Sequence, residues 1–273
     1  MMDLSPLLQK HIKDCLEKNY HVTPEQHLLL VYDQRCTLSK LLAEAYQHVL
    51  STYNYQIIDF DQVSEQSLID TFAALPQKSL VILVQSTSFR LTKHRLRADL
   101  FRAGHQVIEH ARLSFNRDDQ LEQYCEALRY DTPYYVQATN KIARLLDEND
   151  FLRIESGEGL ILEVHSLFEK PIKNTGDFTE NTIASAGFPI GEIFTDAREL
   201  QQMNGEVLVF GFPTLDHKTH FCDPFIVQIK NGCLVKHNGP AVFEEIVSLI
   251  KAEETGGTVQ VREIGFGLNN ALG

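Results

Sequence analysis

Two glutamates stand in glycine-rich, apolar segments that carry little other charge. Glu192 lies in NTIASAGFPIGEIFT, residues 181–195, and Glu263 lies in REIGFGLNNALG, residues 262–273. A carboxylate on an otherwise apolar strand costs several kcal/mol to bury unless it is paired or binds a metal. We therefore interpret Glu192 and Glu263 as two halves of one metal or amine site, whose remaining groups are not apparent in this sequence.

A second candidate metal site is the polar segment DHKTHFCD at residues 216–223. Imidazole, thiolate and carboxylate groups are all zinc ligands, and this segment offers all three. It stands between two expected strands, however, where such residues normally form a solvated turn. We favour the turn.

Basic side chains gather between Arg90 and Arg112, among three histidines. Such a cluster at a helix end is suited to bind a phosphate or a peptide carboxylate, although a solvated helix face is the commoner explanation. Serines at residues 86 and 88 follow an apolar strand, where they either begin a ligand-binding loop or cap the next helix. We include Arg90 among the candidate peptide-binding residues.

The first half of the chain alternates strand patterns with helix patterns. Apolar runs of strand length occur at 27–33, 55–60, 79–85 and 105–108. Helical patterns occur at 37–52, 65–74, 92–103, 117–128 and 132–148. Strands that alternate with helices favour βαβ units, so we predict an α/β domain with a parallel sheet over residues 1–150.

The second half has a different character. Strand patterns joined by Gly, Asn and Asp turns occur at 151–164, 204–211, 220–229, 232–236 and 258–266, with one helical pattern at 240–253. We predict a mostly antiparallel, sheet-rich domain over residues 151–273. A chain of 273 residues is also long for a single core, and the fold class is therefore α/β plus α+β.

Composition narrows the classes of function. No apolar run approaches the roughly 20 residues that span a bilayer, and the amphipathic start lacks the features of a signal peptide, so we expect a cytoplasmic protein without a membrane partner. Five cysteines without a CxxC pair indicate reduced thiols. The net charge of -12 argues against a nucleic-acid partner and favours cationic ligands such as a divalent metal or a peptide amino terminus.

Four segments carry a resemblance to a known family: residues 88–110, 181–195, 229–236 (IKNGCLVK) and 262–269 (REIGFGLN). Together they resemble the thermophilic metallo-aminopeptidase family typified by aminopeptidase T. The resemblance implies an α/β domain followed by a sheet-rich, metal-binding domain. It also implies that Glu192 and Glu263 match two ligands of a two-metal centre, whose other ligands, a His, a Tyr and a His-x-Asp pair, would lie beyond Gly273.

Two carboxylates alone make a poor site for zinc or cobalt. We therefore predict a peptide-binding, non-catalytic relative without a cofactor, in which Glu192, Glu263, Asn269 and Arg90 contact the peptide. The alternative is a metal-dependent aminopeptidase that uses zinc, cobalt or iron, if the chain continues past Gly273. A weaker alternative is a non-haem iron ring-cleaving dioxygenase, because such enzymes are similar to the same fold.

Apolar residues around the two glutamate segments favour self-association. We expect a homodimer that covers them, because a sheet with an apolar face and open edges seeks a partner. The candidate residues for this surface are Phe188, Ile190, Ile193, Phe194, Ile264, Phe266 and Leu268.

Overall fold

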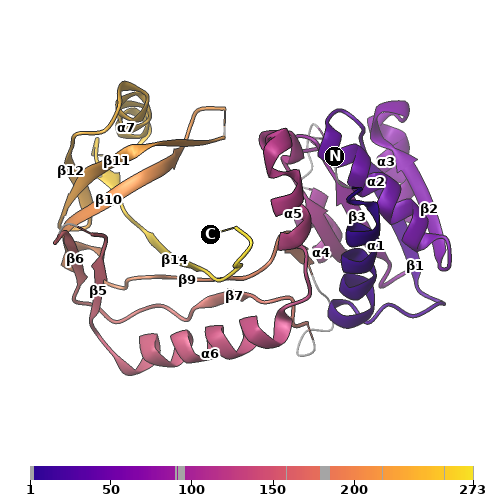
Figure 1. Cartoon of the computed structure of the whole chain (residues 1–273), viewed down its shortest axis with the longest axis horizontal. Helices are drawn as coiled ribbons and strands as arrows, with labels where there is room; N and C mark the ends of the chain where they lie inside the picture. The colour runs from indigo at the N-terminus through magenta and orange to yellow at the C-terminus, as the bar shows by residue number, and fades with distance from the viewer. Residues whose placement is uncertain are drawn as a thin grey trace. The chain divides into compact units, whose positions relative to one another are not determined.

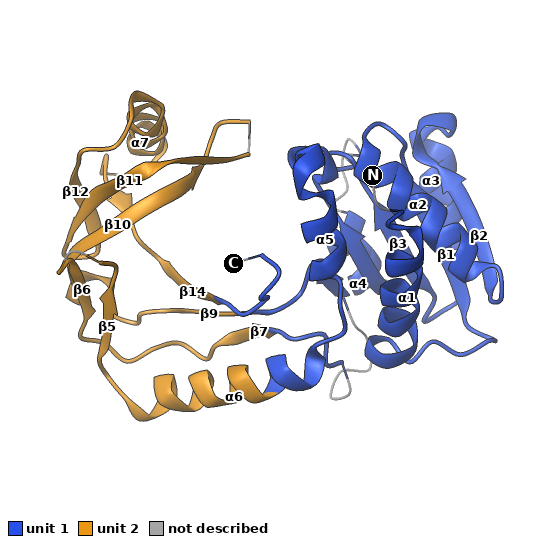
Figure 2. Ribbon diagram, in the orientation of Figure 1, with its two compact units in different colours: residues 1–136, 174–192, 267–273 blue, residues 137–173, 193–266 orange. Residues whose placement is uncertain are grey.

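The computed structural model describes residues 3–89, 91, 96–157, 159–178, 185–216, 218–254 and 256–272. The chain forms two compact units (Figure 2). Unit 1 comprises residues 1–136, 174–192 and 267–273, and unit 2 comprises residues 137–173 and 193–266. The chain therefore passes from one unit to the other four times.

Unit 1 is built on a five-stranded sheet in the order β2-β1-β3-β4-β8 (Figure 1). All four neighbouring pairs are parallel, which confirms the predicted parallel sheet. The strands are β1 (His27–Tyr32), β2 (Asn54–Asp59), β3 (Leu80–Val84), β4 (Gln106–His110) and β8 (Ser185–Gly187). Strand β8 belongs to the segment 174–192, which joins unit 1 from far along the sequence.

Helices cover both faces of this sheet. They are α1 (Ser5–Asp14), which continues as a π-helical turn at Cys15–Asn19, α2 (Thr37–Leu50), α3 (Glu65–Ala74), α4 (Leu96–Arg102) and α5 (Leu121–Ala127). Short 3-10 turns occur at Phe60–Gln62, Leu113–Phe115 and Asp118–Gln120. Helix α6 (Thr132–Glu148) begins in unit 1 and continues into unit 2.

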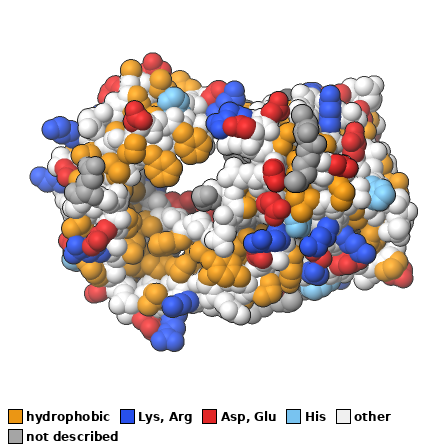
Figure 3. Space-filling view, in the orientation of Figure 1, with side chains coloured by type: hydrophobic (Ala, Val, Ile, Leu, Met, Phe, Trp, Pro, Cys, Tyr) orange, Lys and Arg blue, Asp and Glu red, His pale blue; other side chains and the backbone are white. Residues whose placement is uncertain are grey.

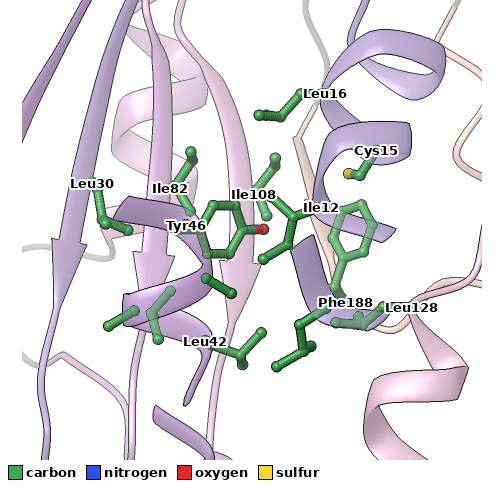
Figure 4. Close-up of a cluster of buried hydrophobic side chains, with 14 of the residues drawn as sticks. Ile12, Cys15, Leu16, Leu30, Leu42, Tyr46, Ile82, Ile108, Leu128 and Phe188 are labelled. Atoms are coloured by element: carbon green, nitrogen blue, oxygen red, sulfur yellow. The ribbon is translucent and has the colours of Figure 1, made fainter. Parts of the chain in front are cut away.

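Alternate residues of the strands enter two separate cores. Leu28 and Leu30 pack with α1, α2 and α5 in one cluster, part of which is drawn in Figure 4. Leu29 and Val31 pack with α3 and α4 in the other. Because successive strand residues point to opposite faces, a sheet covered on both faces requires continuous apolar strands. This explains the uninterrupted apolar run of β1.

Unit 2 contains a six-stranded sheet in the order β13-β12-β11-β10-β6-β5, in which every pairing is antiparallel. Its strands are β5 (Leu152–Glu155), β6 (Ile161–Val164), β10 (Met203–Pro213), β11 (Thr219–Lys230), β12 (Cys233–His237) and β13 (Val259–Gln260). A second sheet has the order β14-β9-β7. Its strands are β7 (Ile172–Asn174), β9 (Glu192–Asp196) and β14 (Glu263–Gly267). The predicted antiparallel sheet is confirmed.

Helix α7 (Ala241–Glu253) and a 3-10 turn at Leu200–Gln202 complete unit 2. Phe243 and Ile246 of α7 pack against the unit 2 core, which includes Phe212 and Phe225 of the long hairpin. Among the described residues, no helix combines the length and apolar character needed to cross a membrane.

The apolar surface that we expected to support a homodimer is not at the surface. Four of its residues are buried, namely Phe188, Ile190, Ile193 and Ile264, and the other three are partly buried. The reason is that Phe188 and Ile190 pack inside the first core of unit 1, while Ile264 packs inside unit 2. The choice of surface was wrong for the four buried residues and stays untested for the three partly buried ones. The homodimer itself stays a prediction that light scattering can test.

Candidate functional site

A small pocket in unit 1 contains two of the residues singled out from the sequence, Glu192 and Asn269. Its volume is 310 Å³. The other lining residues are apolar or glycine: Pro189, Ile190, Gly191, Gly267 and Leu272. The side chains that line the pocket therefore include one carboxylate and one amide, and the others are uncharged.

Gly191 lines the pocket and is fixed by two backbone hydrogen bonds. Its backbone N–H donates to the Asn174 carbonyl at 2.8 Å, and its carbonyl accepts from the Leu268 N–H at 2.8 Å. Its φ is +113°, and a Cβ placed there would lie 2.9 Å from the Tyr135 ring and 3.2 Å from the Asn269 Cβ. Only glycine meets both requirements, and it leads the chain directly to Glu192.

Asn269 is engaged within the protein. Its Nδ2 donates to the carbonyl of Ala127 at 2.8 Å and to the carbonyl of Ile190 at 2.9 Å. Its Oδ1 accepts from the Ala271 N–H at 3.1 Å. The side chain thus ties the segment 267–272 to the end of α5 and to the residue before Gly191. Its contribution to the pocket is to hold this segment in place.

Replacement of Asn269 by alanine is expected to lower the free energy of unfolding by about 1–3 kcal/mol, because two carbonyls lose their donor. Urea denaturation followed by circular dichroism measures the change. Asn270 is the control, since it is the adjacent asparagine and is exposed. Equal effects of Asn269→Ala and Asn270→Ala would contradict the role assigned to Asn269.

Glu192 and Glu263 are both exposed, so the expected cost of burying them does not arise. In β9 and β14 the residues after these glutamates, Ile193 and Ile264, point into the protein, and the glutamates therefore point outward. Glu192 belongs to unit 1 and Glu263 to unit 2. The carboxylate of Glu192 is available at the pocket of unit 1.

The remaining candidates give separate outcomes. Arg90 and His217 lie outside the described residues. Of the rest of the segment 216–223, Asp216 and Lys218 lie between β10 and β11, as we favoured, whereas residues 219–223 belong to strand β11, so the expected turn was wrong for them. Asp216 accepts from the Thr214 hydroxyl and pairs with the Lys218 ammonium at 3.3 Å.

Within the described ranges, no three His, Cys, Asp or Glu side chains are arranged to hold a metal ion. Zinc and cobalt sites usually take three or four protein ligands. The described donors alone therefore do not complete the two-metal centre that the resemblance implies.

A buried carboxylate lies at the carboxyl edge of the parallel sheet, between β1 and β3, where the strand order reverses. Asp33 accepts from the Ser86 N–H at 2.9 Å and from the Ser86 hydroxyl at 2.8 Å. Ser86 therefore donates two hydrogen bonds to the buried Asp33 carboxylate. Local sequence patterns do not indicate this contact between residues 53 positions apart.

A buried hydrogen-bond chain ends on the segment that precedes the pocket residues, and no sequence pattern indicated it. The His110 Nε2 lies 2.8 Å from the Tyr46 hydroxyl, and its Nδ1 lies 2.9 Å from the Tyr124 hydroxyl. Tyr124 in turn donates to the Phe188 carbonyl at 3.4 Å. Burial lowers the pKa of His110 to about 3. The imidazole is neutral, and it links α2 and α5 to the segment that carries Gly191.

Comparison with known proteins bears on the fold. No family model and no curated protein matches the sequence. A solved structure, wild-type AmpT from Thermus thermophilus, is similar over 97% of this chain and 79% of its own chain, with a TM-score of 0.55 and 13% sequence identity. At this identity the similarity concerns the fold. The chain is thus similar in fold to aminopeptidase T.

Proposed function

We propose that this protein binds peptides at the unit 1 pocket, where Glu192 receives the peptide's amino terminus. The observation that carries the proposal is the exposed Glu192 carboxylate at a 310 Å³ pocket whose other lining residues are uncharged. The similarity in fold to AmpT supports it. A pocket of this volume is at the lower end of the range of small-ligand sites and suits one terminal residue of a peptide.

The chemistry of the pocket matches a primary ammonium group. A carboxylate that accepts hydrogen bonds from an ammonium forms a charge-assisted contact, about twice as strong as a neutral one. Pro189, Ile190 and Leu272 offer apolar contact to the adjoining side chain. The net charge of -12 also attracts cationic ligands to the protein. These groups bind and orient a peptide, and no bond needs to be broken.

Glu192→Gln is expected to weaken binding of the free-amine peptide Leu-Ala-Ala-Ala amide by about tenfold, which corresponds to a charged hydrogen bond of about 1.5 kcal/mol. Its effect on the acetylated form should be small, because that form carries no ammonium. Isothermal titration calorimetry with both peptides measures the difference. Glu44→Gln is the control, since Glu44 is an exposed glutamate of α2 and lies outside the pocket. Equal losses for the two peptides would exclude the amine contact.

A metal-dependent aminopeptidase is the second candidate function, and the same similarity in fold favours it. In that case Glu192 and Glu263 would act as metal ligands together with further groups. Mass spectrometric metal analysis of the full-length gene product, after growth with iron, zinc and cobalt, tests this candidate. Stoichiometric metal together with release of leucine from the free-amine peptide would support it, and a metal-free protein that binds the peptide intact would exclude it.

A further inference from the structure

The hairpin of unit 2 extends beyond its partner strands. Strand β10 pairs with β6 only through residues 203–205, and β11 pairs with β12 only from Val227 onward. Residues 206–213 and 219–226 therefore form a two-stranded projection, here named the arm. Hydrophobic side chains are visible at its surface in Figure 3. A two-stranded ribbon gains little stability from exposed apolar groups, so these groups call for an explanation.

Two phenylalanines of the arm are stacked on each other in solvent. Phe210 is 61% exposed and Phe221 is 59% exposed. Their ring centroids are 6.4 Å apart, with 18° between the ring planes. Phe221 lies over Gly211, where a Cβ would come within 3.1 Å of its ring. Paired, exposed aromatic rings of this kind mark interaction sites.

Other phenylalanines of the same hairpin are buried, so exposure is not a general property of its aromatic residues. Phe212 and Phe225 are buried and pack edge-on against each other in the unit 2 core. The pairing of β10 with β11 shifts between Val209 and Gly211, so the arm is irregular where Phe210 occurs. Val209 packs against the unit 2 core, so Phe210, the next residue of the strand, points outward, and the irregularity returns Phe212 to the core.

An exposed carboxylate accompanies the aromatic pair. Asp223 follows Phe221 by two residues, and Cys222 between them packs against the unit 2 core. Since neighbours in a strand point to opposite faces, Phe221 and Asp223 both point away from the core, at a separation of about 6.5–7 Å along the strand. Among the described residues, none forms a hydrogen bond or an ion pair with Asp223.

Two other acidic side chains lie in the arm or its turn. Asp216 is bound to Lys218 in the turn, and Glu206 accepts from the Gln228 amide at 3.3 Å. Glu206 therefore keeps its negative charge, and Asp223, two residues from Phe221, is the described carboxylate nearest in sequence to the aromatic pair. An apolar aromatic surface beside a free carboxylate is complementary to a planar organic cation.

We infer that the arm binds an arginine side chain of a peptide ligand, with the guanidinium over the exposed phenylalanines and its N–H groups on Asp223. Guanidinium stacks on aromatic faces and donates in pairs to carboxylates, which the ammonium of lysine does less well. The inference rests on the proposed function in one respect, that the ligand is a peptide. It does not require a free amino terminus.

The test uses the acetylated, fluorescein-labelled peptide Ala-Ala-Arg-Ala-Ala amide and the same peptide with citrulline, a neutral analogue of arginine. Fluorescence polarisation with the full chain is expected to show binding of the arginine peptide at least about tenfold tighter. Asp223→Asn should remove this preference. Phe221→Ala should weaken binding of the arginine peptide by about fivefold. Circular dichroism checks that both variants fold.

Two matched variants of unit 2 serve as controls. Glu245→Gln removes the same charge from exposed α7, and Phe151→Ala removes an exposed ring outside the arm. Both should bind like the unaltered protein. Absence of discrimination between arginine and citrulline, or equal losses in Asp223→Asn and Glu245→Gln, would overturn the inference. Because the peptides are acetylated, Glu192→Gln should leave these results unchanged, so failure at the pocket and failure at the arm are distinguishable.

Discussion

Gly191→Ala is expected to lower the free energy of unfolding by about 2–6 kcal/mol. A side chain at φ +113° costs about 1–3 kcal/mol in backbone strain. The added methyl group would also lie 2.9 Å from two atoms of the buried Tyr135 ring, and overpacking of a core costs about 1–3 kcal/mol more. Denaturant unfolding followed by circular dichroism measures the sum, since the chain contains no tryptophan for fluorescence.

Gly267→Ala is the matched control because Gly267 lines the same pocket, and a Cβ there meets nothing within 4 Å. Its effect on stability should be within about 0.5 kcal/mol, as for surface substitutions. The Gly191→Ala variant should also lose affinity for the free-amine peptide, since Glu192 is the next residue. If both alanine variants are equally stable, the close contact of Gly191 with Tyr135 does not determine the geometry of the pocket.

The second large effect is a loss of stability in acid that depends on His110. Burial lowers the pKa of His110 to about 3 in the folded protein, whereas an unfolded histidine has a pKa of about 6.5. The folded state therefore binds the proton less well than the unfolded state. The contribution to stability is complete above about pH 6.5 and falls as the pH drops towards 3, by up to about 1.4 kcal/mol per pH unit.

Unfolding free energies of the unaltered protein and of His110→Asn, measured between pH 7 and pH 4.5, test this expectation. The variant should be less stable at pH 7, because Tyr46 and Tyr124 lose a partner, yet its stability should fall less steeply in acid. Burial lowers the pKa of His11 and His105 as well, so the difference between the two proteins is the relevant quantity. Parallel pH dependences would show that His110 is not the group responsible.

The elements of the sheets could be predicted because burial leaves a strong local pattern. Residues 28–31 of β1 are fully buried on both faces, and an unbroken apolar run results. Strand β8 left no such pattern, since Ser185, Ala186 and Gly187 are small residues. Its pairing with Val107 and Ile108 of β4 depends on a segment distant in sequence, and local periodicity carries no information about such a pairing.

The sequence indicated some residues of the candidate site but not how they are arranged. Glu192 and Asn269 were chosen from their segments, and both line one pocket because the Leu268 N–H binds the Gly191 carbonyl. Glu192 was expected to be buried but is exposed. Apolar neighbours in the sequence do not show which face of a strand a residue occupies, because successive residues point to opposite faces. The exposure of Phe210 was not predicted, because the strand pattern at 204–211 does not show which face of the strand lies in the core.

The four passages of the chain between the units have a consequence for synthesis on the ribosome. Most of unit 1 is made before unit 2, yet its fifth strand and the Asn269 contacts to Ala127 and Ile190 come from residues made much later. At about 5–20 residues per second, the interval between Val136 and Asn269 is on the order of ten seconds. Within this interval the outer edge of β4 stays unpaired until residues 185–187 of β8 have been made. Until then the nascent chain offers an unpaired strand edge at β4 to aggregation and to chaperones, and residues 267–273, made after unit 2, complete a unit that was begun before it.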